Sequence, residues 1–218
     1  MTEVDRTRSA LVLGGTGAIG ARIARRLETD GMEVAITGRD PGDLESAGRL
    51  DAVVWAQGTN VNDSVTDLDP AVHEEVLRGN VLFVSLTMAR LLAAGAIADG
   101  ARLCVVSSIW ELAARPGKFS YTISKAAIGG LVRSAAVDLA ERGVLVNAVL
   151  PGVVDTPMTR EMLAPGQVER AAGATGFGRL VALEDVATLV AHLVSPANTG
   201  VTGQSIAVDL GFTVRHDV

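Results

Sequence analysis

The chain contains one tyrosine, Tyr121, and a lysine, Lys125, follows it four residues later. Residues spaced in this way on a helix share one face and lie about one turn apart. A lysine ammonium beside a phenol stabilises the tyrosinate and lowers the tyrosine pKa, which favours proton exchange with a substrate oxygen. Only two of the 19 lysines and arginines are lysines. Because arginine cannot give up its proton, the use of lysine here favours chemistry over the alternative of a surface Tyr/Lys pair.

A glycine-rich segment follows the first apolar run of the chain. Residues 10–13 have the composition of a buried parallel strand, residues 14–20 read Gly-Gly-Thr-Gly-Ala-Ile-Gly, and residues 21–29 are amphipathic. In this strand, turn and helix context, the glycines allow a tight turn, close approach of a pyrophosphate and packing of the helix on the strand. The predicted contacts to a dinucleotide are Gly14, Thr16, Gly17, Ala18, Ile19 and Gly20.

Strand-like and helix-like segments alternate along the rest of the chain. The further predicted strands are 33–37, 52–56, 102–107, 144–149 and 205–209, and the further predicted helices are 69–92, 121–141 and 184–194. This alternation predicts an α/β fold of the Rossmann type, a doubly wound parallel sheet with helices on both faces. The length and the 48% hydrophobic content favour a single domain over residues 1–218, with a polar tail at residues 1–9.

Composition argues against several classes of protein. The net charge is −6 and no basic block is present, so neither a nucleic acid nor a membrane surface is expected as a partner. The single cysteine, Cys104, lies in an apolar run and cannot form an internal disulfide. No signal-peptide core and no run of eighteen apolar residues is found, so we expect a cytoplasmic protein. The three histidines lack metal-ligand spacing, and no metal is expected.

Two serines, Ser107 and Ser108, come at the end of the predicted strand 102–107. In an open α/β sheet, ligands bind beyond the carboxyl ends of the strands. The Ser108 hydroxyl could therefore bind a substrate oxygen while Tyr121 supplies the proton. Ser107 is interpreted as a cap of the strand end, and the same structural interpretation remains open for Ser108.

These motifs, in this order and spacing, resemble those of the short-chain dehydrogenase/reductase family, in particular its compact 3-oxoacyl reductase-like members. The likeness spans nearly the whole chain. It is carried by Gly14 to Gly20, Asn80, Ser108, Tyr121 to Lys125, Pro151 to Thr156 and Val201 to Gln204. The resemblance implies hydride transfer between a nicotinamide cofactor and a ketone or secondary alcohol.

The resemblance also implies a role for each matching residue. Tyr121 acts as general acid or base, Lys125 lowers the tyrosine pKa and binds the nicotinamide ribose, and Ser108 orients the substrate. Asn80 holds a water in the proton relay, with a solvent-facing helical asparagine as the alternative. The other implied cofactor contacts are Ala56 and Gly58 through their backbone, Val154, and the Thr156 hydroxyl. A plain Pro-Gly turn is the alternative for residues 151–156.

The choice of cofactor depends on the end of the second predicted strand, which reads Thr37-Gly38-Arg39. An acidic residue there would bind the adenosine ribose and repel a 2′-phosphate. Gly38 replaces that acid, and Arg39 offers a guanidinium suited to phosphate. We expect NADP(H) to be preferred over NAD(H), although Asp40 weakens the argument and Arg39 could be an ordinary loop residue.

The sequence also departs from the family pattern. Only residues 40–50 separate the second predicted strand from the next one, whereas a strand, helix and strand unit needs about 30 residues. We therefore predict that the usual third strand, at the sheet edge, is missing. Trp55-Ala56-Gln57-Gly58 replaces the usual Asn-Asn-Ala-Gly, and Trp55 could fill the space vacated by the missing segment.

Residues 157–178 are expected to form a lid over a mainly apolar pocket that includes Trp110 and Phe177, although these side chains could equally belong to the core. The expected partner is a small-molecule carbonyl or alcohol, and family resemblance implies a homo-oligomer, either a tetramer or a dimer. Two alternatives remain for the function. One is a non-catalytic NADP(H)-binding regulator or partner subunit, and the other is a sugar-nucleotide epimerase or dehydratase, for whose substrate domain the chain has no room.

Overall fold

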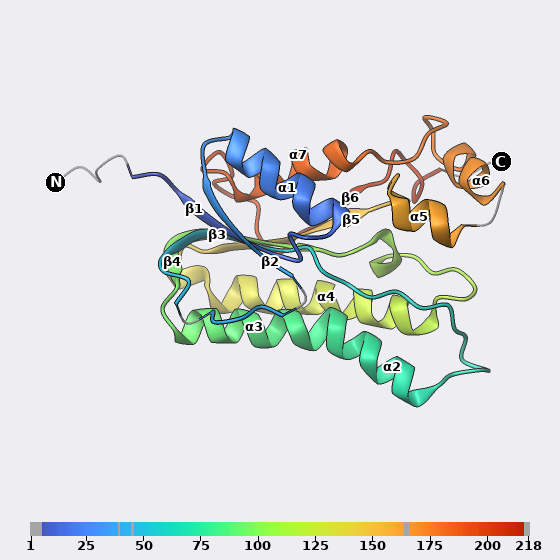
Figure 1. Cartoon of the computed structure of the whole chain (residues 1–218), viewed down its shortest axis with the longest axis horizontal. Helices are drawn as coiled ribbons and strands as arrows, with labels where there is room; N and C mark the ends of the chain where they lie inside the picture. Colours follow the sequence, from blue (N-terminus) through green and yellow to red (C-terminus); the bar gives the residue numbers. More distant parts are fainter. Residues whose placement is uncertain (1–5, 39, 45, 164–165, 216–218) are drawn as a thin grey trace.

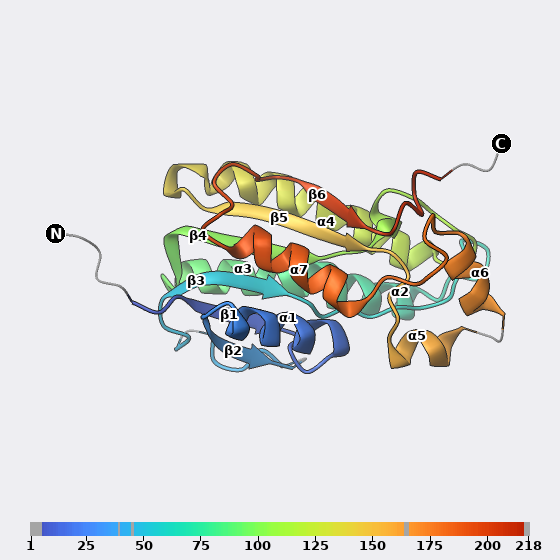
Figure 2. The same ribbon diagram turned by 90° about the horizontal axis from the view of Figure 1, so that it is seen from above.

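The computed structural model describes residues 6–38, 40–44, 46–163 and 166–215, and its frame is one sheet of six parallel strands. Figure 2 shows their order in space, β2-β1-β3-β4-β5-β6. The strands are β1 (Ser9–Leu13), β2 (Glu33–Thr37), β3 (Leu50–Trp55), β4 (Ile97–Val106), β5 (Leu145–Pro151) and β6 (Ser205–Val208). The chain runs outward from β1 to β2, and then crosses back to β3 on the other side of β1. This order confirms the predicted doubly wound sheet.

Helices cover both faces of this sheet (Figure 1). On one face α1 (Ala18–Thr29) packs beside α7 (Leu183–Val194), and the other face carries α3 (Phe83–Ala93) and α4 (Phe119–Asp138). Each face has its own hydrophobic core. Because both faces are covered, the central strands consist of nearly uninterrupted apolar residues.

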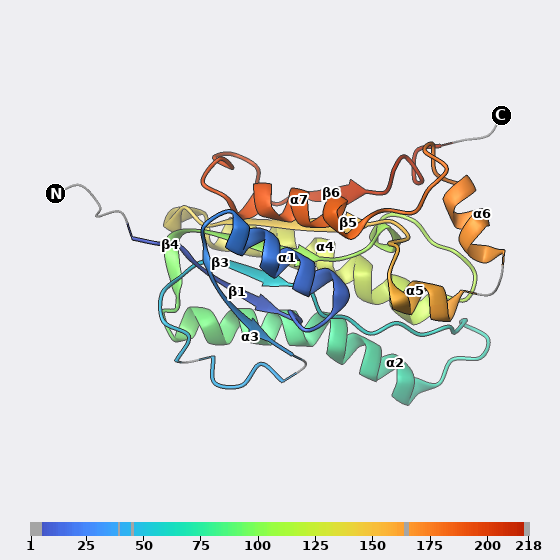
Figure 3. The same cartoon turned by 45° about the horizontal axis from the view of Figure 1, so that its top comes forward.

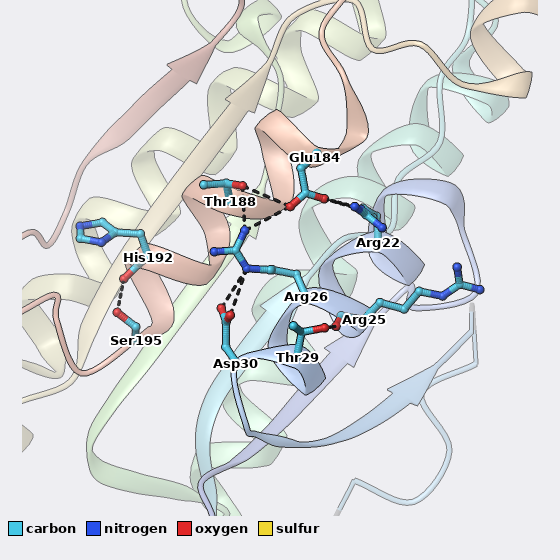
Figure 4. A network of polar contacts seen from close by, with 9 residues as sticks. All are labelled: Arg22, Arg25, Arg26, Thr29, Asp30, Glu184, Thr188, His192 and Ser195. Atoms are coloured by element: carbon cyan, nitrogen blue, oxygen red, sulfur yellow. Dashed lines mark hydrogen bonds and ion pairs between the residues drawn. The ribbon is translucent and has the colours of Figure 1, made fainter.

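A polar network joins α1 and α7 at the surface, as Figure 4 shows. Glu184 on α7 accepts hydrogen bonds from Arg22 and Arg26 on α1, the latter at 3.1 Å. Arg26 also binds Asp30, 3.0 Å away, and Thr188. Exposed ion pairs of this kind contribute little to stability, so the network mainly fixes how the two helices lie against each other.

The segment Pro70–Ala93 is continuously helical and contains α2 (Pro70–Leu77), one π-helical turn η1 (Arg78–Leu82) and α3. The Asp69 carboxylate caps its start by accepting hydrogen bonds from the amides of Ala71 and Val72. Its 24 residues are long and apolar enough to cross a membrane by length and composition, a test that core helices of soluble proteins also pass. The buried apolar side chains of α3, Val84, Met88 and Leu91, belong to the core under the sheet.

The predicted loss of the usual third strand is confirmed. In the described part of residues 38–49, the connection from β2 to β3 contains neither helix nor strand, and β2 forms the edge of the sheet. The connection is anchored by Leu44, which is buried in the same core cluster as Trp55. Trp55 is fully buried, and its indole nitrogen donates to Thr87 Oγ1 at 2.8 Å. Trp55 and Leu44 of the short connection therefore belong to the same core, at the place where the connection from β2 to β3 is shortened.

The remaining helices are short. They are α5 (Pro157–Met162), α6 (Gln167–Gly173) and the 3₁₀ turns η2 (Ile109–Glu111) and η3 (Ala140–Arg142). Figure 3 shows α5 and α6 beyond the carboxyl ends of the strands, at the edge of the sheet where ligands are expected.

Candidate active site

A cleft of about 1260 Å³ opens at the carboxyl ends of the strands. Its lining includes most of the residues that the sequence selected: Gly14, Thr16, Gly17, Ala18, Ile19, Ala56, Gly58, Ser108, Tyr121, Lys125, Val154 and Thr156. Gly20 and Asn80 lie behind this lining, and Arg39 lies outside the described residues. The structure therefore brings the predicted dinucleotide turn and the predicted reacting side chains into one cavity.

The glycine-rich turn is held against the ends of its two neighbouring strands. The amides of Gly14 and Gly15 donate to the Thr37 carbonyl at 3.0 and 2.9 Å. Gly14 has a φ of +83°, and a Cβ there would lie 2.5 Å from the Gln57 amide nitrogen. A Cβ at Gly20 would lie 2.2 Å from the Gly14 carbonyl oxygen. Gly20 therefore seats α1 against the turn, and its predicted contribution to the dinucleotide site is indirect.

Three predicted side chains converge on one wall of the cleft. The Ser108 side chain interacts with the Tyr121 phenol and acts to lower its pKa, and the Lys125 Nζ lies 5.6 Å from the centroid of the tyrosine ring. Lys125 is buried, and its ammonium donates to the Val106 carbonyl at 3.4 Å. The positions follow from the elements: Ser108 caps η2 two residues after the end of β4, whereas Tyr121 and Lys125 stand one turn apart on α4.

The pKa of Tyr121 shifts in a different direction from the one that the sequence predicted. Burial raises the pKa of Tyr121, and the interaction with Ser108 only partly opposes it. The net direction is upward, opposite to the lowering that the Tyr/Lys spacing predicted. Burial also lowers the pKa of Lys125 to about 8, against the attraction of Glu111. Both shifts have the same physical cause, since loss of water disfavours each charged form.

Asn80 sits in the π-helical turn η1 and is buried. Its Oδ1 accepts from the Thr59 amide at 2.7 Å, and its Nδ2 donates to the Thr59 carbonyl and to Ser124 Oγ, each at 2.9 Å. π turns occur often at functional sites, where they redirect a side chain. The alternative of a solvent-facing asparagine is therefore wrong, because Asn80 joins the loop after β3 to the helix of Tyr121.

The second lysine, Lys118, was missed by the sequence argument. It is buried just before α4, and its Nζ donates to Asn60 Oδ1 at 2.7 Å, Asn62 Oδ1 at 2.6 Å and the Val61 carbonyl at 3.1 Å. Its Nζ also lies 5.8 Å from the centroid of the Tyr121 ring. Lys118 precedes Tyr121 by three residues, a helical spacing that could have revealed it.

The segment after β5 supplies the remaining predicted contacts. Val154 forms an isolated bridge with Val181, which fixes the backbone at the floor of the cleft. Thr156 caps α5 by accepting a hydrogen bond from the Thr159 amide at 3.1 Å. Val154 and Thr156 both line the cleft, so both residues remain placed to contact a ligand. Phe177 is 70% exposed and does not line the cleft, so its predicted place in an apolar pocket is wrong.

Several buried polar atoms along the cleft lack a partner in the described structure. Both polar atoms of the Gln57 side chain and the Ser107 hydroxyl are buried without a hydrogen bond. Such atoms are costly unless a ligand or water satisfies them. Together with the close-packed glycine turn, they fit a nicotinamide dinucleotide that would lie from Gly14 to Tyr121.

Comparison with known proteins identifies the family. A family model described as "Enoyl-(Acyl carrier protein) reductase" matches residues 42–213. The chain is also 32% identical to cis-4-hydroxycyclohexanecarboxylate dehydrogenase of Sinomonas cyclohexanicum, covering 98% of this chain and 99% of that protein. The chain belongs to the short-chain dehydrogenase/reductase family. The alignment with that dehydrogenase is 248 positions long, which is longer than the chain of this short-chain dehydrogenase/reductase. The shorter chain is consistent with its missing strand.

Two further similarities agree. Cyclopentanol dehydrogenase of Comamonas sp. is 34% identical over 79% of this chain and 69% of that protein. The solved structure of an actinorhodin polyketide ketoreductase with NADPH superimposes with a TM-score of 0.85 at 25% identity, over 96% of this chain and 98% of that one. The protein is thus an oxidoreductase of a family that uses a nicotinamide cofactor and acts on alcohols and ketones.

Proposed function

We propose that this protein is an NADP(H)-dependent oxidoreductase that interconverts a cyclic ketone and the corresponding secondary alcohol, with Tyr121 as general acid and base. The observation that carries the proposal is the convergence of Ser108, Tyr121 and Lys125 on one wall of the cleft that also contains the glycine-rich turn. A non-catalytic binding protein would have no need to bury a lysine beside the single tyrosine.

The chain's own residues supply binding and proton transfer. Ser108 and Tyr121 both line the cleft and would present two hydroxyls to a substrate oxygen. The raised tyrosine pKa keeps the phenol protonated, as an acid must be before reduction. Lys125 keeps a positive charge beside the phenol as it becomes an anion, and can donate to the nicotinamide ribose. The cofactor, when bound, supplies or accepts the hydride.

Support for NADP(H) comes from the end of β2. Gly38 lines the cleft there, where a carboxylate would disfavour a 2′-phosphate. The similar ketoreductase structure was solved with NADPH. Support for a cyclic substrate comes from two relatives, named for cis-4-hydroxycyclohexanecarboxylate and cyclopentanol.

We also propose a cytoplasmic homo-oligomer, either dimer or tetramer, with residues 157–178 as the lid. Exposed apolar side chains on the outer side of α3 and α4, Leu86 at 60% and Val137 at 76% exposure, are consistent with contacts between copies. Light scattering of the purified protein tests the oligomeric state, and a monomer would contradict the proposal. Fractionation of the source cells tests the cytoplasmic location.

The decisive experiment measures NADPH oxidation with cyclopentanone and cyclohexanone derivatives, using the wild type and Tyr121→Phe. Loss of the phenolic hydroxyl should lower kcat by about 10²- to 10⁴-fold. NADPH binding, followed by nucleotide fluorescence, should stay within about threefold because the ring remains. Tight NADPH binding without turnover of any ketone by the wild type would favour the regulator.

A further inference from the structure

Positive charge is concentrated around the tyrosine in the cleft. The charged residues that line the cleft are Lys125, Lys118, Arg115, Arg78, Arg170 and Glu75. Among the described residues, no carboxylate lies within 4.0 Å of Lys125, Lys118 or Arg115. A cleft lined mainly by one sign of charge attracts anions and raises their local concentration.

Lys118 and Arg115, which both line the cleft, have different roles. All three protons of the Lys118 ammonium are used, because it donates to Asn60, Asn62 and the Val61 carbonyl. Lys118 therefore contributes charge but has no donor left for a substrate. The nearby Asp63 accepts two hydrogen bonds from Ser120, and it forms no ion pair with Lys118.

Arg115 has donors to offer, as do Arg78 and Arg170, but among the described residues it is the arginine of the cleft that lies over an aromatic ring. Its guanidinium lies 5.7 Å from the centroid of the Trp110 ring, which also lines the cleft. Trp110 is itself held edge-on against Phe212, with ring centroids 6.1 Å apart. Within the described structure Arg115 donates no hydrogen bond to the protein, and it is close enough to Lys118 to lower that lysine's pKa. The aromatic contact thus orients a planar, exposed donor that forms no ion pair within the described residues.

We propose that the substrate of this cleft carries a carboxylate, which Arg115 binds through its paired N–H groups while Lys118 adds charge from behind. A planar guanidinium and a carboxylate match in two parallel hydrogen bonds, and this geometry selects carboxylates over neutral groups. The proposal rests on the proposed ketone reduction at Tyr121 and names its substrate class.

A pair of matched ketones tests the proposal. The reduction of 4-oxocyclohexanecarboxylate and of 4-oxocyclohexanecarboxamide is compared at pH 7 and saturating NADPH. The wild type should prefer the carboxylate in kcat/KM by about tenfold or more. Arg115→Gln should lower kcat/KM for the carboxylate by about tenfold or more and change that for the carboxamide by less than about threefold. Arg115→Lys should fall between the two.

Arg49→Gln is the matched control, because Arg49 is exposed at the amino end of β3 and does not line the cleft. It should leave both ketones unaffected. The proposal is overturned if the wild type does not discriminate between the ketones, or if Arg115→Gln lowers the reduction of both equally, as a packing role on Trp110 would.

A binding measurement separates this proposal from the proposed reaction. Trp110 lines the cleft and Trp55 is fully buried, so a ligand in the cleft should change the fluorescence of Trp110. Cyclohexanecarboxylate is titrated into Tyr121→Phe protein with and without Arg115→Gln. If neither ketone is reduced, the reaction is wrong; binding that Arg115→Gln weakens about tenfold still supports the anion site, and no binding by either variant overturns it.

Discussion

The ammonium of Lys125 lies 5.6 Å from the centre of the Tyr121 ring, and within the described chain no carboxylate forms an ion pair with it. Burial lowers the pKa of this lysine to about 8, because a charged group has been taken out of water with little compensation. The buried charge of Lys125 therefore lowers the free energy of unfolding, and the proposed reaction needs that same charge.

Replacing Lys125 with Met should therefore stabilise the protein at pH 7 while it abolishes turnover. Lysine in an unfolded chain has a pKa near 10.4, whereas the folded value is about 8. The unfolded chain thus binds more protons between pH 8 and 10, and this residue makes stability rise with pH across that window. At pH 7 the variant should gain about 1–3 kcal/mol in free energy of unfolding, measured in urea, and the gain should shrink towards pH 10. A gain that is constant with pH would contradict this account.

Cofactor preference should respond to Gly38. A Cβ there would lie no closer than 3.7 Å to another side chain, so the position accepts a substitution. Gly38→Asp would place a carboxylate at the end of β2, where it repels a 2′-phosphate and can accept from ribose hydroxyls. We expect the ratio of kcat/KM for NADPH to that for NADH to fall by about tenfold or more. Gly38→Asn, of the same shape without the charge, should shift the ratio much less; equal shifts would refute the electrostatic cause.

Gly14→Ala should be more destabilising than Gly31→Ala. Both glycines have a positive φ, +83° and +87°, so both variants carry a backbone cost of about 1–2 kcal/mol. The new Cβ at Gly14 would also collide with the backbone of Gln57, whereas nothing lies within 4 Å at Gly31. Urea unfolding should separate the variants by about 1–3 kcal/mol, and only Gly14→Ala should weaken NADPH binding. Similar losses for both variants would mean that the backbone of the turn shifts at little cost to accommodate the new Cβ at residue 14.

Asn80→Ala should loosen the connection between the loop after β3 and α4. The variant leaves the Thr59 amide and carbonyl and the Ser124 hydroxyl without their buried partner. We expect a loss of about 1–3 kcal/mol in urea unfolding together with a lower kcat. Asn80→Asp retains the acceptor for the Thr59 amide and should recover part of the stability. Full activity in the alanine variant would exclude both a positioning and a relay role.

The fold was largely predictable because each central strand is an apolar run between turn residues, and the parallel arrangement buries both faces of such runs. The missing edge strand could be predicted from length alone, since residues 40–50 leave no room for it. The full extent of β4 could not: it begins at Ile97, five residues before the predicted start, because Asp99 and Gly100 interrupt the apolar pattern. The π turn at Asn80 was also hidden, because one extra residue in a helix leaves no mark in composition.

The candidate site was predictable where a motif fixes both residue type and spacing, as for Tyr121 and Lys125 on α4. For Lys118 the spacing to Tyr121 was informative, but its hydrogen-bond partners were not predictable, because they lie on a loop 56 to 58 residues earlier in the chain. Arg115 was missed for a different reason: its position over Trp110, five residues earlier, depends on how the loop between η2 and α4 folds back.

The position of β2 at the edge of the sheet affects how easily its backbone hydrogen bonds open. Within the described structure β2 pairs only with β1, and its side chains are exposed or half-buried, with Ile36 at 53% exposure. Backbone amides of an edge strand open at a lower free energy than those of central strands. The amides of β2 should therefore exchange with deuterium before those of β3 and β4. A nucleotide bound along Gly38 would slow that exchange, because part of its binding energy would go into ordering this edge of the sheet.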